Sequence, residues 1–228
     1  MNLRSRVLEQ LGTVYDPELD EPITTLGFVG SLVVTDAGDV SVRLRLPTPQ
    51  CAPNFAFLMA ADARAAVDRV PGLGQVSIVL EDHYTGDEIN AAVGRDTGFD
   101  AAFPGETTGD LEALRELFRR KALLARQARL CQQLLAGGTS PEAVVALRVA
   151  DLPDSPEALR GLELRAALGL PHGPQAPALV SGDGGPLSAD ELPTWLRRAR
   201  LVSLSLETNG GTCRDLLKTR YREEEVAA

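Results

Sequence analysis

The sequence contains few of the residues from which metal centres, disulfides and aromatic cores are usually built. Its 228 residues include three cysteines, two histidines and 4% aromatic residues. The cysteines stand far apart and form no Cys-x-x-Cys pair, so neither a disulfide framework nor a zinc-finger spacing is indicated. We therefore expect a core of Leu, Val and Ala, and a cytoplasmic protein, since this cysteine usage suits a reducing compartment.

Long apolar segments and excess positive charge are also missing. No run approaches the roughly 20 apolar residues that a membrane span needs, and the first residues lack the apolar stretch of a signal peptide. The formal net charge is −9, and anionic lipids and nucleic acids would repel such a chain. The sequence thus predicts neither a membrane nor a nucleic-acid partner.

The first part of the chain predicts the order helix, strand, strand, helix, strand. Apolar residues recur at helical intervals over 3–12, and two strands flank a turn at 35–39, of which the second alternates strictly between apolar and polar residues and so has a wet face. A second helix begins with Pro53, and a third strand covers 75–84. The hairpin makes the first two strands antiparallel, and the helical crossover makes the third strand parallel to the second.

The whole chain predicts an α+β fold in two parts. We assign residues 1–98 to the α-β-β-α-β small-sheet domain, with a short helix at 88–93, and residues 99–109 to a linker. Residues 110–228 form an accessory domain, mostly helical, that ends in a β-α-β-like segment.

The accessory domain opens with a long helix over 110–136, whose residues 115–129 carry a basic face. The Ser-Pro-Glu sequences at 140–142 and 155–157 begin two further helices. Residues 173–207 then predict strand, turn, helix and strand. A Gly-rich turn and a short basic helix complete the chain.

Cys51 lies in the loop between the second strand and the second helix, in the stretch "LPTPQCAPNF". The prolines stiffen the loop, and the following helix N-terminus favours a thiolate, as metal ligand or as nucleophile. The alternative is a small buried apolar residue, the usual state of a free cysteine. By topology, Cys51, Asp82, His83 and the loop of Asp16 and Glu18 share one edge of the sheet.

Other polar residues could complete a metal site with Cys51. His83 with Asp82 and Glu88 makes a set suited to iron or zinc, although a histidine after a strand often only donates hydrogen bonds. Cys213 follows the Gly-rich turn and is expected to be a thiolate by the reasoning used for Cys51, or else a core cysteine. Asp16 and Glu18 are candidate ligands or simply turn formers. Cys131, within the long helix, is expected in the core, and His172 in a loop.

Three stretches resemble the PaaD/SufT-type iron–sulfur cluster assembly domain family: "VYDPELDEPITTLGFVGSLVV", "VRLRLPTPQCAPNF" and "VPGLGQVSIVL". They supply the family's Asp-Pro-Glu at 16–18, its Leu-Gly-x-Val at 26–29, and Thr48, Cys51 and Pro53 of its cysteine loop. Ala52 is a departure, because the family commonly places Pro directly after Cys. The resemblance covers residues 1–84 and implies that Cys51 is the reactive, cofactor-binding position.

The arrangement as a whole, with "DHYTGDEIN" and the Cys-Arg-x-Leu-Leu sequence at 213–217, is similar to larger family members that accompany bacterial multicomponent di-iron monooxygenases. The leading hypothesis is a non-catalytic maturation factor for a client metalloprotein, such as a monooxygenase component. It would carry iron or an iron–sulfur cluster transiently, with candidate metal ligands Cys51, His83, Glu88 and Cys213. An open sheet edge favours a homodimer.

Two alternatives stay open. One is a metal-free adaptor that grips an acidic partner through the basic helix face at 115–129. The other is a thiol enzyme with Cys51 as nucleophile and His83 as base.

Overall fold

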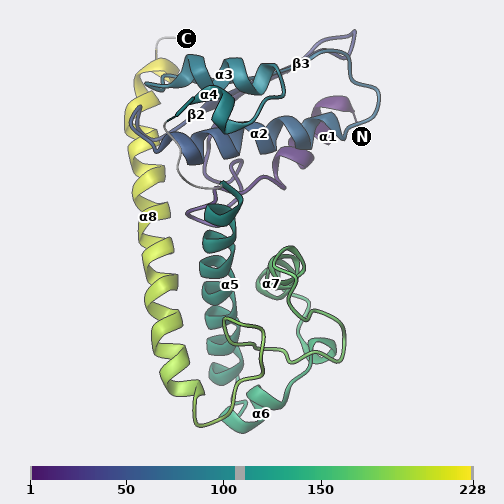
Figure 1. Cartoon of the computed structure of the whole chain (residues 1–228), viewed down its shortest axis with the longest axis vertical. Helices are drawn as coiled ribbons and strands as arrows, with labels where there is room; N and C mark the ends of the chain where they lie inside the picture. Colours follow the sequence, from purple (N-terminus) through teal and green to yellow (C-terminus); the bar gives the residue numbers. More distant parts are fainter. Residues whose placement is uncertain (1, 106–110, 227–228) are drawn as a thin grey trace. The chain divides into compact units, whose positions relative to one another are not determined.

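A computed structural model describes residues 2–105 and 111–226, with the side chains of 222–226 excepted (Figure 1). Its internal contacts form two compact units: residues 1–112 together with 209–228 make the first unit, and residues 113–208 make the second. The predicted domain limits at 98 and 110 stay a prediction.

The first unit is built on a three-stranded sheet in the order β1-β2-β3. The chain runs from α1 (Leu3–Leu11) through β1 (Val29–Val34), β2 (Val40–Arg45) and α2 (Pro53–Asp68) to β3 (Val76–Glu81). β1 and β2 are antiparallel, and β2 and β3 are parallel. The predicted element order and both strand directions are confirmed.

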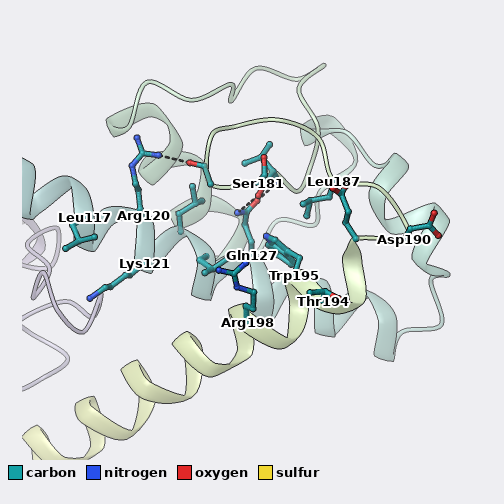
Figure 2. Close-up of a pocket in the computed structure, with 15 residues that line it drawn as sticks. Leu117, Arg120, Lys121, Gln127, Ser181, Leu187, Asp190, Thr194, Trp195 and Arg198 are labelled. Carbon is teal, nitrogen blue, oxygen red and sulfur yellow. Dashed lines mark hydrogen bonds between the residues drawn. The ribbon is translucent and has the colours of Figure 1, made fainter.

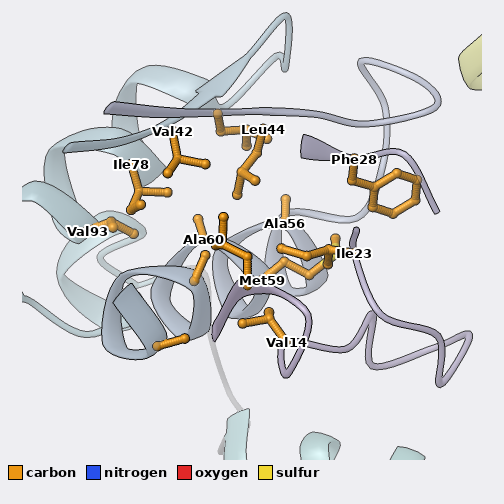
Figure 3. Close-up of a cluster of buried hydrophobic side chains, with 14 of the residues drawn as sticks. Val14, Ile23, Phe28, Val42, Leu44, Ala56, Met59, Ala60, Ile78 and Val93 are labelled. Carbon is orange, nitrogen blue, oxygen red and sulfur yellow. The ribbon is translucent and has the colours of Figure 1, made fainter. Parts of the chain in front are cut away.

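The core of this unit lies between the sheet and α2 (Figure 3). Val42 and Leu44 of β2 are buried, whereas Arg43 between them is exposed, so the predicted alternation of an apolar and a wet face is confirmed. α2 meets the sheet with small residues, Ala56 and Ala60 among them. Small side chains let the helix lie close to the strands and still exclude water.

Two short helices follow β3. α3 spans Gly86–Gly94, wider than the predicted helix at 88–93, and α4 spans Phe99–Ala102 within the expected linker. The Asn90 side chain accepts a hydrogen bond from the Leu80 N–H at 2.8 Å and donates one to its carbonyl at 3.0 Å. This pair of bonds satisfies the outer edge of β3 and fixes the carboxyl end of that strand.

The second unit contains most of α5 (Leu111–Ala136), α6 (Pro141–Ala146), η1 (Val149–Asp151) and α7 (Pro156–Ala167). The Ser140 and Ser155 side chains accept hydrogen bonds from the backbone N–H of Ala143 and Ala158. Both predicted helix starts are therefore confirmed.

The prediction that the accessory domain ends in a β-α-β-like segment is wrong. One helix, α8 (Leu192–Val226), replaces the predicted helix, final strand, Gly-rich turn and short basic helix, and no strand occurs among the described residues between 174 and 191. Ala199, Ser203, Leu206 and Gly210 are buried at helical intervals of three and four. The overall α+β class is nevertheless confirmed, because the chain combines these helices with the three-stranded sheet of the first unit.

Gly210 explains why a glycine pair lies inside a helix. A Cβ atom at this position would lie 2.6 Å from Glu21 Oε1, so the helix approaches the loop after α1 more closely than a side chain would allow. Tertiary packing thus overrides the low helix propensity of "NGG". Within the described residues, no helix combines the length and hydropathy needed to cross a bilayer.

Candidate functional site

The loop between β2 and α2 presents Cys51 next to the start of a helix. α2 begins at Pro53 after Ala52, which supplies no side-chain capping bond. The Thr48 hydroxyl lies 3.6 Å from the Cys51 sulfur, and the Cys51 N–H donates to the Thr48 carbonyl. The thiol is a half-buried free cysteine beside the apolar core. The predicted position of Cys51, in a loop next to the unpaired N–H groups of a helix N-terminus, is confirmed.

His83 holds the backbone of this loop. The Thr85 N–H donates to His83 Nδ1 at 3.3 Å, so Nε2 carries the proton and donates to the Cys51 carbonyl at 2.7 Å. Burial, assisted by the positive charge of Arg220, lowers the pKa of the imidazole. His83 is therefore a neutral group with both ring nitrogens in use, and it fixes the peptide that carries the sulfur.

Cys213 packs against the same apolar core of the first unit as Cys51, although the two are far apart in the sequence. Burial raises the pKa of the Cys213 thiol to about 11, and electrostatic interactions with Asp16, Cys51 and Glu18 raise it further, in that order. The expectation of a thiolate at the start of a short helix was wrong here. Cys213 lies within α8, where the helix N-terminus is too distant to stabilise a negative charge.

The end of α8 is fastened to the carboxyl ends of β2 and β3. The Arg220 guanidinium donates to the Leu46 carbonyl at 3.0 Å and to the Asp82 carbonyl at 2.6 Å. The Tyr221 hydroxyl donates to the Asp82 carboxylate at 3.2 Å. Leu46 follows β2 and Asp82 follows β3, so these bonds tie the helix to the edge where the Cys51 loop begins.

Sequence reasoning missed this attachment because it predicted a Gly-rich turn and a separate short basic helix in place of one continuous helix. Cys213, Leu217 and Arg220 follow at steps of four and three, so they share one face of a helix. Leu217 is buried in the core of the first unit. That spacing was the available signal for a common helix face, and it falls on the segment that the sequence predicts as a short basic helix after the Gly-rich turn.

The Asp-Pro-Glu loop contributes a buried carboxyl to the same region. Asp16 accepts hydrogen bonds from the Glu18 and Leu19 N–H groups, each at 2.8 Å, and so forms the turn. Burial raises the pKa of Asp16 to about 6, against these two hydrogen bonds. Glu18 is exposed.

The remaining candidate residues do not join Cys51 in a shared cluster of polar side chains. Glu88 is exposed in the first turn of α3, without a hydrogen bond or ion pair to any described residue. Cys131 is fully buried in the core of the second unit, as expected, and His172 lies in an exposed loop. Among the described residues, no group of three or more His, Cys, Asp or Glu side chains is arranged to hold a metal ion. The ligand set Cys51, His83, Glu88 and Cys213 stays a prediction.

The comparison with known proteins concerns the first unit. The sequence profile of the iron–sulfur cluster assembly protein family matches residues 4–79. An uncharacterised protein of Methanocaldococcus jannaschii is 32% identical over 90 residues, which are 40% of this chain and 93% of that protein.

Two mycobacterial proteins named iron–sulfur cluster carrier protein match a similar stretch. Those of Mycobacterium leprae and Mycobacterium tuberculosis are 35% and 36% identical over 80 residues, which are 35% of this chain. This chain spans only 20% of their length. The profile match and the archaeal relative, which is covered almost end to end, show that the chain belongs to the iron–sulfur cluster assembly protein family.

Proposed function

We propose that the first unit carries an iron–sulfur cluster transiently, with the sulfur atoms of Cys51 and Cys213 as protein ligands, and passes it to a client metalloprotein. The observation that carries this proposal is that Cys51 of the β2–α2 loop and Cys213 of α8 both pack against the apolar core of the first unit. Family membership supports iron–sulfur chemistry, and the carrier relatives support transfer.

Two thiolates suit a cluster that must leave again. Stable iron–sulfur sites usually have four cysteine ligands, so a pair leaves positions open for the client or for a second copy of the chain. A two-thiolate site is therefore a holding site.

Loading the site requires a proton to leave. Metal ligands must be deprotonated, and Cys213 is a thiol near neutral pH because its pKa is about 11. Each loading event releases that proton, so the affinity for the cluster increases with pH. His83 serves in this proposal as a positioning residue, because both of its ring nitrogens are in use.

The test is anaerobic reconstitution of the full chain with ferrous iron, with and without sulfide, followed by assay of bound iron and acid-labile sulfide. We expect the wild type to bind both, and Cys51→Ser and Cys213→Ser each to lose most of the cluster. Cys131→Ala removes the third cysteine from the second unit and should bind like the wild type. Retention of the full cluster by a folded Cys51→Ser variant contradicts the proposal.

Further variants separate ligands from positioning residues. His83→Gln should bind iron in the same stoichiometry but release it faster, because the Cys51 loop loses its anchor. Glu88→Gln should bind like the wild type, and loss of iron from it would restore Glu88 to the ligand set.

The finer parts of the proposal concern location, client and assembly. The protein is cytoplasmic, its client is a component of a di-iron monooxygenase, and two copies share a cluster as a homodimer. The resemblance of the tail and of "DHYTGDEIN" to monooxygenase-associated proteins supports the client. Iron transfer to such an apo-component, and light scattering with and without the cluster, test these parts.

The adaptor alternative has less support. Arg126 and Arg129 on the basic face of α5 form ion pairs with Glu157 of α7. These two charges therefore stabilise the second unit. Full client activation by Cys51→Ser would favour the adaptor.

A further inference from the structure

The second unit contains a cavity that the iron–sulfur proposal does not use. Its volume is about 740 Å³, and α5, the loop of residues 180–187 and the first turns of α8 line it (Figure 2). Pockets for small organic molecules typically have volumes of about 300–1,000 Å³. The cavity therefore has the size of a small-molecule site.

The walls of the cavity are largely apolar. They are formed by Leu117, Leu123, Leu124, Val180, Leu187 and Trp195. The Trp195 indole N–H is buried and has no hydrogen-bond partner among the described residues. An apolar ligand body matches these walls, and Trp195 is the only tryptophan of the chain.

The wall at Gln127 is fixed before any ligand arrives. The Gln127 Oε1 atom accepts hydrogen bonds from the Val180 N–H at 2.8 Å and from the Arg165 guanidinium at 2.9 Å. Its Nε2 atom donates to the Val180 carbonyl. A preformed wall reduces the ordering cost of binding.

One charged side chain at the cavity is uncommitted and directed inward. The Arg120 guanidinium forms an ion pair with Glu116 and donates a hydrogen bond to the Gly182 carbonyl, and the Lys121 ammonium lies over the Phe118 ring. Arg198 has no hydrogen bond or ion pair within the part of the chain that the structure describes. Figure 2 shows Arg198 reaching from α8 toward Gln127.

The acidic groups of the lining are less available. The Glu191 carboxylate accepts hydrogen bonds from the Ser188 hydroxyl and N–H. The Asp190 carboxylate points away from Gln127 and Trp195 (Figure 2). The charge directed at a ligand is therefore positive, and a guanidinium pairs well with a carboxylate through two parallel hydrogen bonds.

We propose that this cavity binds a small organic acid with an apolar body, the body against Trp195 and the leucines and the carboxylate on Arg198. The inference is independent of the cysteine site, since every residue that it uses lies within the second unit. It gives the chain a ligand site besides its metal-handling role.

The probe ligands are decanoate, decanol and decyltrimethylammonium, which share a chain length and differ in head-group charge. Binding to the full chain is followed by the fluorescence of Trp195 and by calorimetry. We expect saturable binding of decanoate, at least tenfold weaker binding of decanol because it lacks the charge-assisted pair, and the weakest binding for the cation. No saturable decanoate signal, or equal affinity for the three ligands, overturns the proposal.

Arg198→Gln should weaken decanoate binding at least tenfold and leave decanol binding unchanged. Arg200→Gln is the matched control, since Arg200 is exposed on the same helix and does not line the cavity. Cys51→Ser should bind decanoate like the wild type. An equal loss in both arginine variants would show a general charge effect and overturn the assignment to Arg198.

Discussion

Asp16 combines a structural role with an electrostatic cost. Its carboxyl is 7% exposed and accepts two backbone hydrogen bonds, yet burial raises its pKa to about 6. A folded state that prefers the protonated acid is stabilised at low pH and loses that stabilisation as the pH increases.

The sign follows from the two pKa values. Below the ordinary value of 3.8 both states hold the proton. Between that value and about 6 the unfolded state has released the proton and the folded state has not, so the contribution of Asp16 to stability decreases through this window. Above it the loss is complete and amounts to about 3 kcal/mol.

Asp16→Asn should therefore stabilise the first unit by up to about 3 kcal/mol at pH 8 and by little at pH 4. The amide oxygen still accepts the bonds from Glu18 and Leu19, while the buried charge is gone. Urea unfolding across this pH range, monitored by circular dichroism, measures the difference from the wild type. Asp36→Asn, on an exposed turn, should show no such trend, and an equal gain at every pH would rule out the buried charge as the cause.

At the scale of elements, the local sequence was sufficient to predict helix starts and strands that are determined by interactions between neighbouring residues. Pro53 at the first helical position and Ser140 and Ser155 as caps defined three helix starts, and strict alternation defined β2. The Cys51 loop was found for the same reason, since it lies between two such elements. The hydrogen bonds of His83 and Arg220 were not predictable, because their partners are backbone carbonyls that every sequence has.

α8 shows where local patterns mislead. "RLVSLSLE" alternates apolar and polar residues and so predicts a strand, but the buried positions Ala199, Ser203 and Leu206 follow a helical period. The glycine pair predicts a turn, yet Gly210 is held against Glu21, which also pairs with Arg214. Contacts between residues distant in sequence decided both cases.

The two glycines make a matched pair for testing this account. Around Gly211 a Cβ atom meets nothing within 4 Å, so Gly211→Ala should stabilise α8 by about 0.5–1 kcal/mol through helix propensity. Gly210→Ala gains the same propensity but must displace the Glu21 carboxylate from Arg214, and the net effect should be near zero or destabilising. Thermal unfolding measures both variants.

Arg214→Gln provides the control for this pair. It removes the partner of Glu21 and leaves the Glu21 carboxylate free to move aside. The difference in stability between Gly210→Ala and Gly211→Ala should therefore be smaller in this background. An undiminished gap would show that the backbone of the Asp16–Glu21 loop, and not the Glu21 side chain, limits the approach of α8.

At the scale of the whole molecule, the family match ends within β3 and so covers only part of the first unit. Residues 4–79 match the family profile, whereas residues 113–208 form a unit with buried clusters of its own. Arg165 of this unit is 2% exposed and donates to the carbonyls of Pro171, Pro177 and Ala178 and to Gln127. The second unit is therefore stabilised separately, by a buried cation with neutral acceptors.

Because the second unit is stabilised by its own interactions, we expect it to unfold locally without the first unit. Arg165→Lys keeps the charge but loses the fork of donors, so buried carbonyls lose their partners and the second unit should lose about 3 kcal/mol. In native-state hydrogen exchange of the full chain, amides of α5 and α7 should then exchange about 100-fold faster, since each 1.4 kcal/mol corresponds to a factor of ten. Amides of β2 and β3 should keep their wild-type rates.

The converse variant completes the test. Asp16→Asn at pH 8 should slow exchange in β2 and β3 and leave α5 and α7 unchanged. α8 is the informative element, because its residues up to 208 belong to the second unit and the rest to the first. Its early amides should follow Arg165→Lys and its amides around Cys213 should follow Asp16→Asn. Equal acceleration of β2 and α7 by Arg165→Lys would instead mean that the chain opens as one cooperative unit.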